Sequence, residues 1–430
     1  MVLASSKIVE VKAREVLDSR GNPTVEAEVR TASFKVTATA PSGASTGTHE
    51  VLELRDGGTR FLGKGVSKAV DNVNKKIAPK LKGHEVEDLA AIDEIMIKLD
   101  GTPNKSKLGG NAVVAVSLAV AKAGAIAKGV ELYEHLGKGS RTLPIPMMNI
   151  INGGKHAGTG LSIQEFMIVP AGAKCFADAL RMGAEVYQTL RGILKEAYGP
   201  SAINIGDEGG FAPPFETSQQ AMQTIIKAIE KAGYVPGKDI FLALDCAASE
   251  FCIQGVYSID KRRIGPMDLM ETYFSWVKNF PIISIEDPFH EEAWDMMAMI
   301  TLRLGHKVQL VGDDMFVTNV ERIKRAIEKQ AGNATLLKVN QIGSVSEAMA
   351  AAKLSFDYGY RVVVSHRSGE TEDTSIADLA VALECGQIKT GAPARGERTA
   401  KYNRLLRIEE ELGSKAKFPG ASFYAKKSKD

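Results

Sequence analysis

Six short apolar runs in the second half of the chain each end in a polar residue, and this pattern constrains the fold more than any other. The polar endings are Asp245, Glu286, Asp313, Lys338, His366 and Lys389, separated by 23 to 41 residues. Helix-like stretches lie between them, and this alternation is typical of repeated βα units. A barrel of parallel strands carries its active site at the C-terminal ends of those strands. The pattern therefore predicts an α/β barrel with carboxylates, lysines and a histidine on one rim.

The first third of the chain has a different pattern. Apolar and polar residues alternate between Thr24 and Val29, which predicts a half-buried strand, and residues 34–40 predict a second one. Three helical stretches follow, near residues 65–80, 86–99 and 110–128. Strands followed by helices indicate an α+β domain. Glycines and prolines near residue 140 mark its end, so we expect an N-terminal α+β domain over residues 1–138 and a barrel domain over residues 139–430.

Composition excludes several classes of protein. The net charge of +2, with 44% hydrophobic and 25% charged residues, is ordinary for a globular protein and gives no reason to expect nucleic acid as a partner. The four cysteines form no C-x-x-C pair, which favours reduced thiols and a cytoplasmic location. No signal peptide is recognisable. The uncharged run from Ala112 to Ala121 is half the ~20 residues that cross a bilayer, so we expect a buried helix and no membrane span.

Three carboxylates at strand ends, Asp245, Glu286 and Asp313, would repel one another unless a cation lay among them. Ligands that are all oxygen favour a hard ion, Mg²⁺ above all. The alternative is that each carboxylate only caps the helix that follows. Asp287 and Asp314 are the adjacent acids, and we expect both to point away from the site because side chains alternate along a strand.

Lys338 and Glu208 are the candidates for proton transfer. Burial lowers the pKa of a lysine, so Lys338 could act as a general base, and a second charge on Lys389 would lower that pKa further. Glu208 lies in Gly206-Asp-Glu-Gly-Gly210, after a predicted strand at 202–205, and is a candidate general acid. The alternatives are that the lysines extend to solvent and that residues 206–210 form a plain acidic turn.

Three further segments are weak signals on their own. Ser42-Gly-Ala-Ser-Thr-Gly47 could fold over a phosphate or a metal, and Asn152-Gly-Gly-Lys-His156 is a similar loop with an imidazole. Arg367 and Ser368 could hold an anion, the arginine through its forked donors. Each segment could equally be a solvated turn.

Taken together, a base, an acid, a cation site and an anion-binding pair suit one reaction type. That reaction removes a proton next to a carboxylate and then expels a β-leaving group. Its barrier is electrostatic, because the intermediate is a dianion, and positive charge placed in advance stabilises it. These residues alone leave acid-sugar dehydratases and racemases as alternatives.

Over nearly its whole length the chain resembles the enolase family. The most specific stretches are Pro41-Ser-Gly-Ala-Ser-Thr-Gly47, Gln164-Glu-Phe-Met167, Gly206-Asp-Glu-Gly-Gly210, Ser284-Ile-Glu-Asp-Pro288, Leu336-Leu-Lys-Val-Asn-Gln-Ile-Gly343, Ser365-His-Arg-Ser-Gly-Glu-Thr-Glu-Asp373 and Lys389-Thr-Gly-Ala-Pro393. The resemblance implies dehydration of 2-phosphoglycerate to phosphoenolpyruvate, a step of glycolysis and gluconeogenesis. It also implies a barrel of the ββαα(βα)6 type, and such sites pair a lysine base with one or two Mg²⁺ ions.

The resemblance also assigns roles to matching positions. Lys338 would take the C2 proton, and Glu208 would help the C3 hydroxyl to leave. The first Mg²⁺ would bind Asp245, Glu286 and Asp313, and a second would bind with the substrate and Ser45. Arg367 and Ser368 would hold the phosphate, and Lys389 would face the carboxylate. The remaining substrate-binding residues would be His156, Gln164, Glu165 and His366, with Glu286 and Asp313 also facing the substrate.

For assembly, the resemblance implies a cytosolic homodimer, as in most eukaryotic members, and leaves an octamer, as in some bacterial members, as the alternative. The main alternative in another class is a binding or structural protein that keeps the fold, as enolase-like lens crystallins and surface plasminogen receptors do. Intact Lys338 and Glu208 argue against a purely structural role. A C-terminal lysine would favour plasminogen binding, and this sequence ends in Lys429-Asp430, which gives that role little support.

Overall fold

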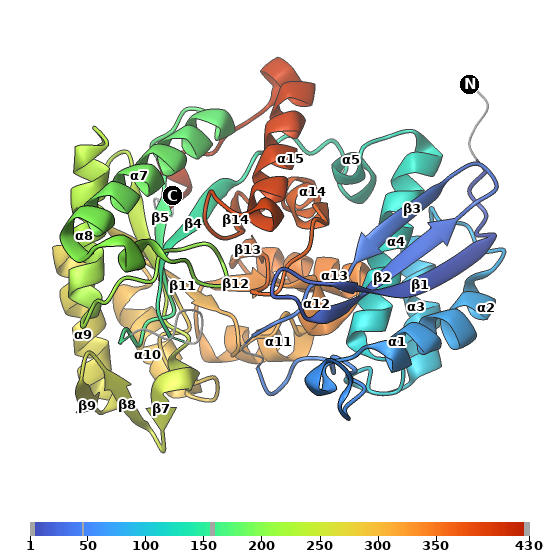
Figure 1. Cartoon of the computed structure of the whole chain (residues 1–430), viewed down its shortest axis with the longest axis horizontal. Coiled ribbons are helices and arrows are strands. Elements are labelled where there is room, and N and C mark those ends of the chain that lie inside the picture. The colour runs from blue at the N-terminus through green and yellow to red at the C-terminus, as the bar shows by residue number, and fades with distance from the viewer. Residues whose placement is uncertain (1–4, 45–46, 155–159, 425–430) are drawn as a thin grey trace.

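The computed structural model describes residues 5–44, 47–154 and 160–424. Its N-terminal part contains an antiparallel sheet of three strands in the order β1-β2-β3. The strands are β1 (Glu10–Leu17), β2 (Pro23–Arg30) and β3 (Lys35–Thr39). In β2 the residues Val25, Ala27 and Val29 are fully buried, as their alternation predicts. Figure 1 shows this sheet packed on helix α4 (Gly110–Lys128), at the blue end of the chain.

Helices complete this α+β unit. They are α1 (Ser67–Asn72), α2 (Ala78–Leu81), α3 (Leu89–Asp100), α4 and α5 (Leu132–Leu136), with a π turn at Val73–Ile77 between α1 and α2. By length and composition α4 could cross a membrane, but 89% of its apolar window is buried inside the protein. It is a buried helix, as the sequence predicts.

A closed barrel of eight strands forms the second part. The strands are β4 (Ile145–Asn152), β5 (Glu165–Val169), β6 (Phe241–Asp245), β10 (Ile282–Glu286), β11 (Gln309–Gly312), β12 (Ala334–Leu337), β13 (Arg361–Ser365) and β14 (Gln387–Lys389). Strand β5 is antiparallel to both of its neighbours, and every other pair is parallel. This order confirms the predicted ββαα(βα)6 barrel.

Helices surround the barrel and connect its strands (Figure 1). Two of them, α7 (Phe176–Tyr198) and α8 (Ser218–Lys231), lie between β5 and β6. The others are α9 (Pro266–Asn279), α10 (Trp294–Leu304), α11 (Val320–Lys329), α12 (Val339–Ile342), α13 (Val345–Asp357), α14 (Ser375–Ala382) and α15 (Gly396–Leu412). A small sheet of β7 (Cys252–Ile253), β8 (Val256–Ile259) and β9 (Arg262–Ile264) is inserted after β6.

The predicted strand ends are confirmed. Asp245, Glu286 and Lys389 are the last residues of their strands, and Asp313, Lys338 and His366 follow theirs directly. The predicted strand at 202–205 is wrong: Pro200–Ile203 is a 3₁₀ turn. Gly199 adopts a positive φ of 82° and Pro200 occupies the first helical position, so the chain turns there before it can extend.

Apolar side chains fill the barrel below the rim. This inner cluster contains Ile145, Met147, Met167, Val169, Ala171, Ala243, Val311, Ala334, Leu336 and Val363. Two buried amides, Gln309 and Gln387, exchange hydrogen bonds of 2.9 and 3.0 Å, so neither is left unpaired. The charged groups therefore gather at the open end of a packed core.

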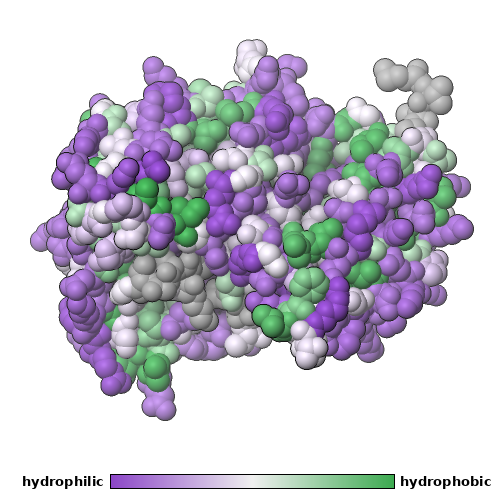
Figure 2. Space-filling model, viewed as in Figure 1, coloured by the Kyte–Doolittle hydropathy of each residue, from purple (hydrophilic) through white to green (hydrophobic). Residues whose placement is uncertain are grey.

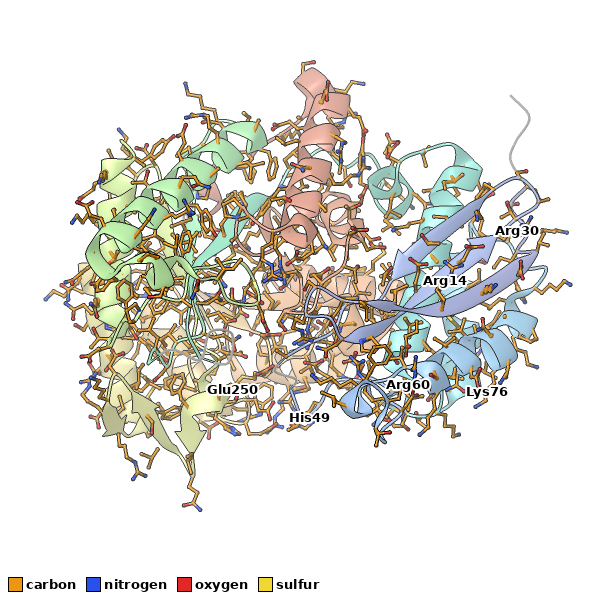
Figure 3. The ribbon with its side chains drawn as sticks, in the orientation of Figure 1. Arg14, Arg30, His49, Arg60, Lys76 and Glu250 are labelled. Carbon is orange, nitrogen blue, oxygen red and sulfur yellow. The ribbon has the colours of Figure 1, made fainter. Side chains whose placement is uncertain are left out.

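Segments of the N-terminal part reach across to the barrel. Ser42 and Gly369 exchange backbone hydrogen bonds, Lys122 pairs with Asp373 at 2.6 Å, and His49 Nε2 lies 2.8 Å from Glu292 Oε1. Figure 3 labels His49 near the junction of the two parts, whereas Arg14 and Arg30 lie on the sheet. Polar residues cover most of the face shown in Figure 2. The junction thus carries residues of the first domain to the rim.

The residue before Asp313 offers a test of how tightly the rim is packed. A Cβ at Gly312 would lie 2.7 Å from three atoms of the buried Phe316 ring. We expect Gly312→Ala to lower the free energy of unfolding by about 1–3 kcal/mol in urea titrations, because a rigid ring must move. Gly192→Ala, in α7 with open space around it, should instead raise it by about 0.5–1 kcal/mol. Equal effects at both positions would contradict this packing.

Candidate active site

A buried ammonium lies at the centre of the rim. Lys389 Nζ donates to Asp245 Oδ2 at 2.8 Å and to both Glu286 oxygens at 2.9 Å, and it pairs with Glu165 Oε1 at 3.1 Å. All four side chains are at most 4% exposed. Burial acts to lower the pKa of Lys389, but these carboxylates raise it well above its usual value. Lys389 therefore stays charged and does not extend to solvent.

Lys338 forms the second pair of the rim. Its ammonium contacts Asp313 Oδ2 at 2.5 Å, and the other Asp313 oxygen accepts from Gln341 Nε2 at 2.8 Å. The expectation of a lowered pKa for Lys338 is wrong in this structure. Burial lowers that pKa, but the charges of Asp313 and Glu286 more than offset burial, and the net direction is upward.

Negative charge exceeds positive charge at this rim. Burial raises the pKa of Glu286 well above its usual value, and the nearby Asp245 charge raises it further. The pKa of Glu165 is raised in the same way by burial and by Glu208. By contrast, burial opposes ionisation of Asp245, but Lys389 outweighs it and the pKa of Asp245 is lowered. An additional cation would relieve the repulsion among these groups.

The donor set fits a hard divalent cation. Asp245, Glu286 and Asp313 offer buried carboxylate oxygens, the ligands that Mg²⁺ prefers. Two more buried oxygens, Glu165 Oε2 and Gln164 Oε1, have no hydrogen-bond partner among the described residues. In this structure the Lys389 ammonium lies between Asp245 and Glu286 and binds both. Two groups of side chains have potential metal-ligand atoms within 4.8 Å of one another. One group is Glu165, Glu208 and His366, and the other is Asp287, Asp313 and Asp314.

Asp287 and Asp314, which are expected to point away from the site, each place a carboxylate oxygen within 4.8 Å of an oxygen of Asp313. Asp287 accepts hydrogen bonds from the backbone N–H groups of Asp313 and Asp314, at 2.9 and 2.7 Å. The strand ends at Glu286, and Asp287 has a positive φ of 42°, so the alternation of side chains no longer applies. Asp287 thereby fixes the backbone that carries Asp313.

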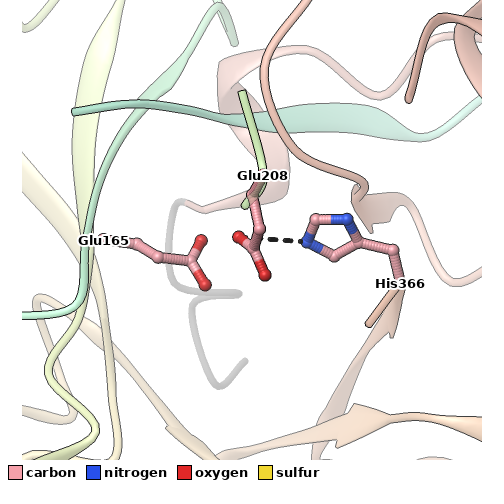
Figure 4. Close-up of side chains that lie close together, drawn as sticks. All are labelled: Glu165, Glu208 and His366. Atoms are coloured by element: carbon pink, nitrogen blue, oxygen red, sulfur yellow. Dashed lines mark ion pairs between the residues drawn. The ribbon is translucent and has the colours of Figure 1, made fainter. Parts of the chain in front are cut away.

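Glu208 comes from an earlier connection and meets His366 inside the rim. Figure 4 shows Glu165, Glu208 and His366 converging, with Glu208 Oε2 lying 3.4 Å from His366 Nε2. Asn149 Nδ2 donates to the same oxygen at 3.1 Å. Tyr187 binds the carbonyl of Gly209 at 2.7 Å and holds this segment in place. Burial lowers the pKa of His366 to about 4, so its imidazole is neutral.

Arg367 and Ser368 lie at the edge of the same pocket. Arg367 donates to both oxygens of Glu50, at 2.8 and 3.1 Å, and to Asn340 Oδ1 at 3.1 Å. Ser368 Oγ accepts from Arg20 at 3.4 Å. The sequence reasoning missed Glu50, although this acid lies only three residues after Gly47, the end of the loop singled out above.

The structure brings most predicted residues into one pocket. Its lining contains Gln164, Glu165, Glu208, Asp245, Lys338, Ser365, His366, Arg367, Ser368 and Lys389. Glu286 joins this group through Lys389, and Asp313 through Lys338. Predicted residues Ser45 and His156 lie outside the described residues.

Comparisons with known proteins agree with this geometry. Residues 140–427 match the family model described as "Enolase, C-terminal TIM barrel domain", and residues 8–136 match "Enolase, N-terminal domain". The chain belongs to the enolase family. It is 58% identical to the enolases of Thermococcus gammatolerans and Methanocaldococcus jannaschii, over 97% of this chain and 98% of each relative. The enolase of Elusimicrobium minutum is 55% identical, over 98% of this chain and the whole relative.

Removal of the central ammonium tests the charge balance of this enolase rim. Lys389→Met would leave Asp245, Glu286 and Glu165 buried without that cation. We expect the free energy of unfolding, measured in urea with a chelator at pH 7, to fall by about 3–5 kcal/mol. Lys353→Met, which removes an exposed lysine, should change it by less than about 0.5 kcal/mol.

The loss should also depend on pH. The pKa of Glu286 is already raised in the folded state, so the folded protein binds more protons than the unfolded chain above the usual glutamate pKa. Stability therefore decreases as pH rises through that interval, and the variant should regain stability as pH falls from 7 towards 5. A loss that is independent of pH would contradict this account.

Proposed function

We propose that this chain catalyses the reversible dehydration of 2-phospho-D-glycerate to phosphoenolpyruvate, as a phosphopyruvate hydratase of glycolysis and gluconeogenesis. The observation that carries this function is membership of the enolase family over nearly the whole chain. Lys338, Glu208 and Asp245 line one buried pocket, and Glu286 and Asp313 contact its two lysines. Purified protein with Mg²⁺ and 2-phosphoglycerate should generate the ultraviolet absorbance of phosphoenolpyruvate. If the protein is folded and supplied with Mg²⁺ but does not turn over 2-phosphoglycerate, the proposed function is refuted.

Lys338 is the proposed base for the C2 proton. A base must be neutral to accept a proton, and the Asp313 contact of 2.5 Å now favours the ammonium form. Mg²⁺, when bound by Asp245, Glu286 and Asp313, supplies positive charge for the substrate carboxylate and offsets the Asp313 charge that raises the pKa of Lys338. Lys389 adds fixed positive charge for the same carboxylate, which becomes a dianion after proton removal.

Glu208 is the proposed acid for the C3 hydroxyl. It is buried and lines the same pocket as Lys338. Its neighbour Glu165 favours a shared proton, because two adjacent carboxylates cannot both ionise easily. The proton passes to the hydroxyl oxygen as the C3–O bond breaks, and water leaves. Base and acid on different barrel units allow proton removal and hydroxyl loss on separate faces of a small substrate.

Arg367 and Ser368 are the proposed phosphate ligands. The guanidinium of Arg367 is held by Glu50 and Asn340, so it is oriented before any anion arrives. Gln164, Glu165, Glu286, Asp313 and His366 would complete the substrate pocket. His156 and Ser45 keep their predicted roles as a substrate ligand and as a ligand of the second Mg²⁺. Two Mg²⁺ ions per site are part of the proposal.

We also propose a cytoplasmic homodimer with a domain boundary between residues 138 and 139. A cleft of about 890 Å³ lies where the end of β1 meets α15, and its lining is largely polar and charged, including Glu26, Lys122 and Glu397. The homodimer proposal is that a second copy of the chain contacts these polar and charged groups. Among the described residues no specific feature favours a second role such as plasminogen binding.

The division of labour between base and acid can be measured by isotope exchange. Lys338→Ala should abolish exchange of the C2 proton of 2-phosphoglycerate with solvent, because no other group is assigned to remove it. Glu208→Gln should lower dehydration by about 10²–10⁴-fold and leave that exchange measurable by NMR. Lys353→Ala is the matched control for a lysine removed from the surface. If Glu208→Gln stops exchange as completely as Lys338→Ala, the assignment is wrong.

Mg²⁺ binding should release protons. The pKa values of Glu286 and Glu165 are raised well above normal by burial and nearby carboxylates, so the metal-free pocket keeps its protons to a higher pH than free glutamates do. A divalent cation that binds these carboxylates displaces the protons that remain. Titration calorimetry at pH 7 in two buffers of different ionisation enthalpy should give different apparent heats. Glu286→Gln should reduce the difference. Identical heats in both buffers would show that the carboxylates are already ionised.

A further inference from the structure

Arg398 is a buried cation that the proposed mechanism does not use. It lies in α15, its side chain is fully buried, and it ranks among the largest buried side chains of the described chain. Nη1 donates to His366 Nδ1 and to the Arg367 carbonyl, both at 2.6 Å. Nη2 donates to the carbonyls of Ser368 at 2.6 Å and Asp207 at 3.0 Å. One guanidinium thus joins the segment of the proposed acid to the segment of the proposed phosphate ligands.

The contact with His366 determines where the imidazole proton lies. A guanidinium carries only donors and keeps its charge, so the ring nitrogen that faces Arg398 must be the acceptor. Nδ1 therefore holds a lone pair, and in the neutral ring the proton is on Nε2. A second proton on Nδ1 would face the arginine at 2.6 Å and be repelled.

Nε2 points to the reaction pocket. It lies 3.4 Å from Glu208 Oε2, within ion-pair distance (Figure 4). It makes no hydrogen bond to any described residue. The ring is 2% exposed, so bulk water does not compete for it. A donor in this position is available to Glu208 or to a bound ligand beside it.

We propose that Arg398 is a positioning residue that fixes His366 as the Nε2–H tautomer and so makes His366 a hydrogen-bond donor to the Glu208 side of the pocket. Because Nε2 already carries a proton and Nδ1 faces a cation, His366 cannot take the proton of Glu208. That proton stays available for the leaving hydroxyl. After its transfer, the Nε2–H can donate to the Glu208 carboxylate that forms.

Without Arg398 the ring could place its proton on Nδ1 and its lone pair on Nε2. The lone pair would then accept the Glu208 proton in a hydrogen bond or remove it outright, and the acid would be lost. This consequence for turnover rests on the proposed function. The tautomer itself depends only on the contacts of Arg398 and can be measured without substrate.

The direct test is a long-range ¹H–¹⁵N spectrum of the full-length, ¹⁵N-histidine-labelled protein at neutral pH. His366→Gln identifies the His366 signals by their disappearance. We expect a pyridine-type shift at Nδ1 and a pyrrole-type shift at Nε2. A proton on Nδ1, or averaged shifts in the unmodified protein, would overturn the proposal, and this measurement needs no Arg398 variant to fold.

Variants on the same helix separate this role from general stability. Arg398→Met should shift both ring nitrogens towards a mixture of tautomers, and Arg398→Lys, which keeps a cationic donor, should partly restore the original signals. Lys401→Met removes another fully buried cation of α15, one that binds Thr371 and Glu370 instead, and should leave the His366 tautomer unchanged. An unchanged tautomer in Arg398→Met would refute the proposal.

Kinetics distinguish this inference from the proposed function. In Arg398→Met, kcat for 2-phosphoglycerate should fall by about tenfold or more, because the acid loses its proton donor form, and Arg398→Lys should recover part of that loss. Absence of turnover in the unmodified protein, with Nε2–H present, would refute the proposed function and leave the tautomer assignment standing. Turnover with the proton on Nδ1 would refute the assignment alone.

Discussion

The rim of this barrel depends on the ion contacts of Lys389. Its ammonium touches carboxylates from β5, β6 and β10, so one cation holds together three strand ends that would otherwise repel. Net stabilisation by a buried pair is often small, because desolvation offsets attraction, but a carboxylate left alone there is costly. The ion contacts of Lys389 therefore fix the positions of the three carboxylates relative to one another more than they stabilise the fold. Those positions are what a small, charged substrate and its cation need.

A second network connects the rim to the N-terminal domain. The Lys338 backbone donates to Thr318 Oγ1 at 2.9 Å, Thr318 donates to Gln341 at 2.9 Å, and Gln341 donates to Asp313, which contacts the Lys338 ammonium. Glu50 completes the connection, because it accepts from Gln341 Nε2 at 3.4 Å and also pairs with Arg367. The first domain thus contributes a carboxylate that orients the proposed phosphate ligand. This explains why a barrel alone would be an incomplete site.

The strand ends could be predicted because buried strands appear in the sequence as apolar runs. Apolar runs between polar endings predicted the barrel, and they placed Asp245, Glu286 and Lys389 on one rim. Contacts between segments that are distant in sequence have no such pattern. Nothing local to Glu50 or Arg398 indicates that each binds the segment of residues 366–368, since both contacts depend on how separate units pack. The predicted direction of the Lys338 pKa shift was wrong for the same reason. Burial of Lys338 could be predicted from the sequence, but its 2.5 Å contact with Asp313 could not.

The contact between Lys338 and Asp313 couples protonation of the lysine to cation binding at the aspartate. Asp313 is both the partner of the Lys338 ammonium and a proposed ligand of Mg²⁺, so its charge can serve only one of them fully. By thermodynamic linkage, whatever favours cation binding at Asp313 must also favour loss of the proton from Lys338, and the reverse holds equally. Without the cation, the charge of Asp313 favours the protonated form of Lys338, the proposed base. Gln341 donates to the other oxygen of Asp313 and fixes that carboxylate beside Lys338. Loss of the proton from Lys338, the proposed base, therefore depends on occupancy of the proposed cation site as well as on burial of the lysine.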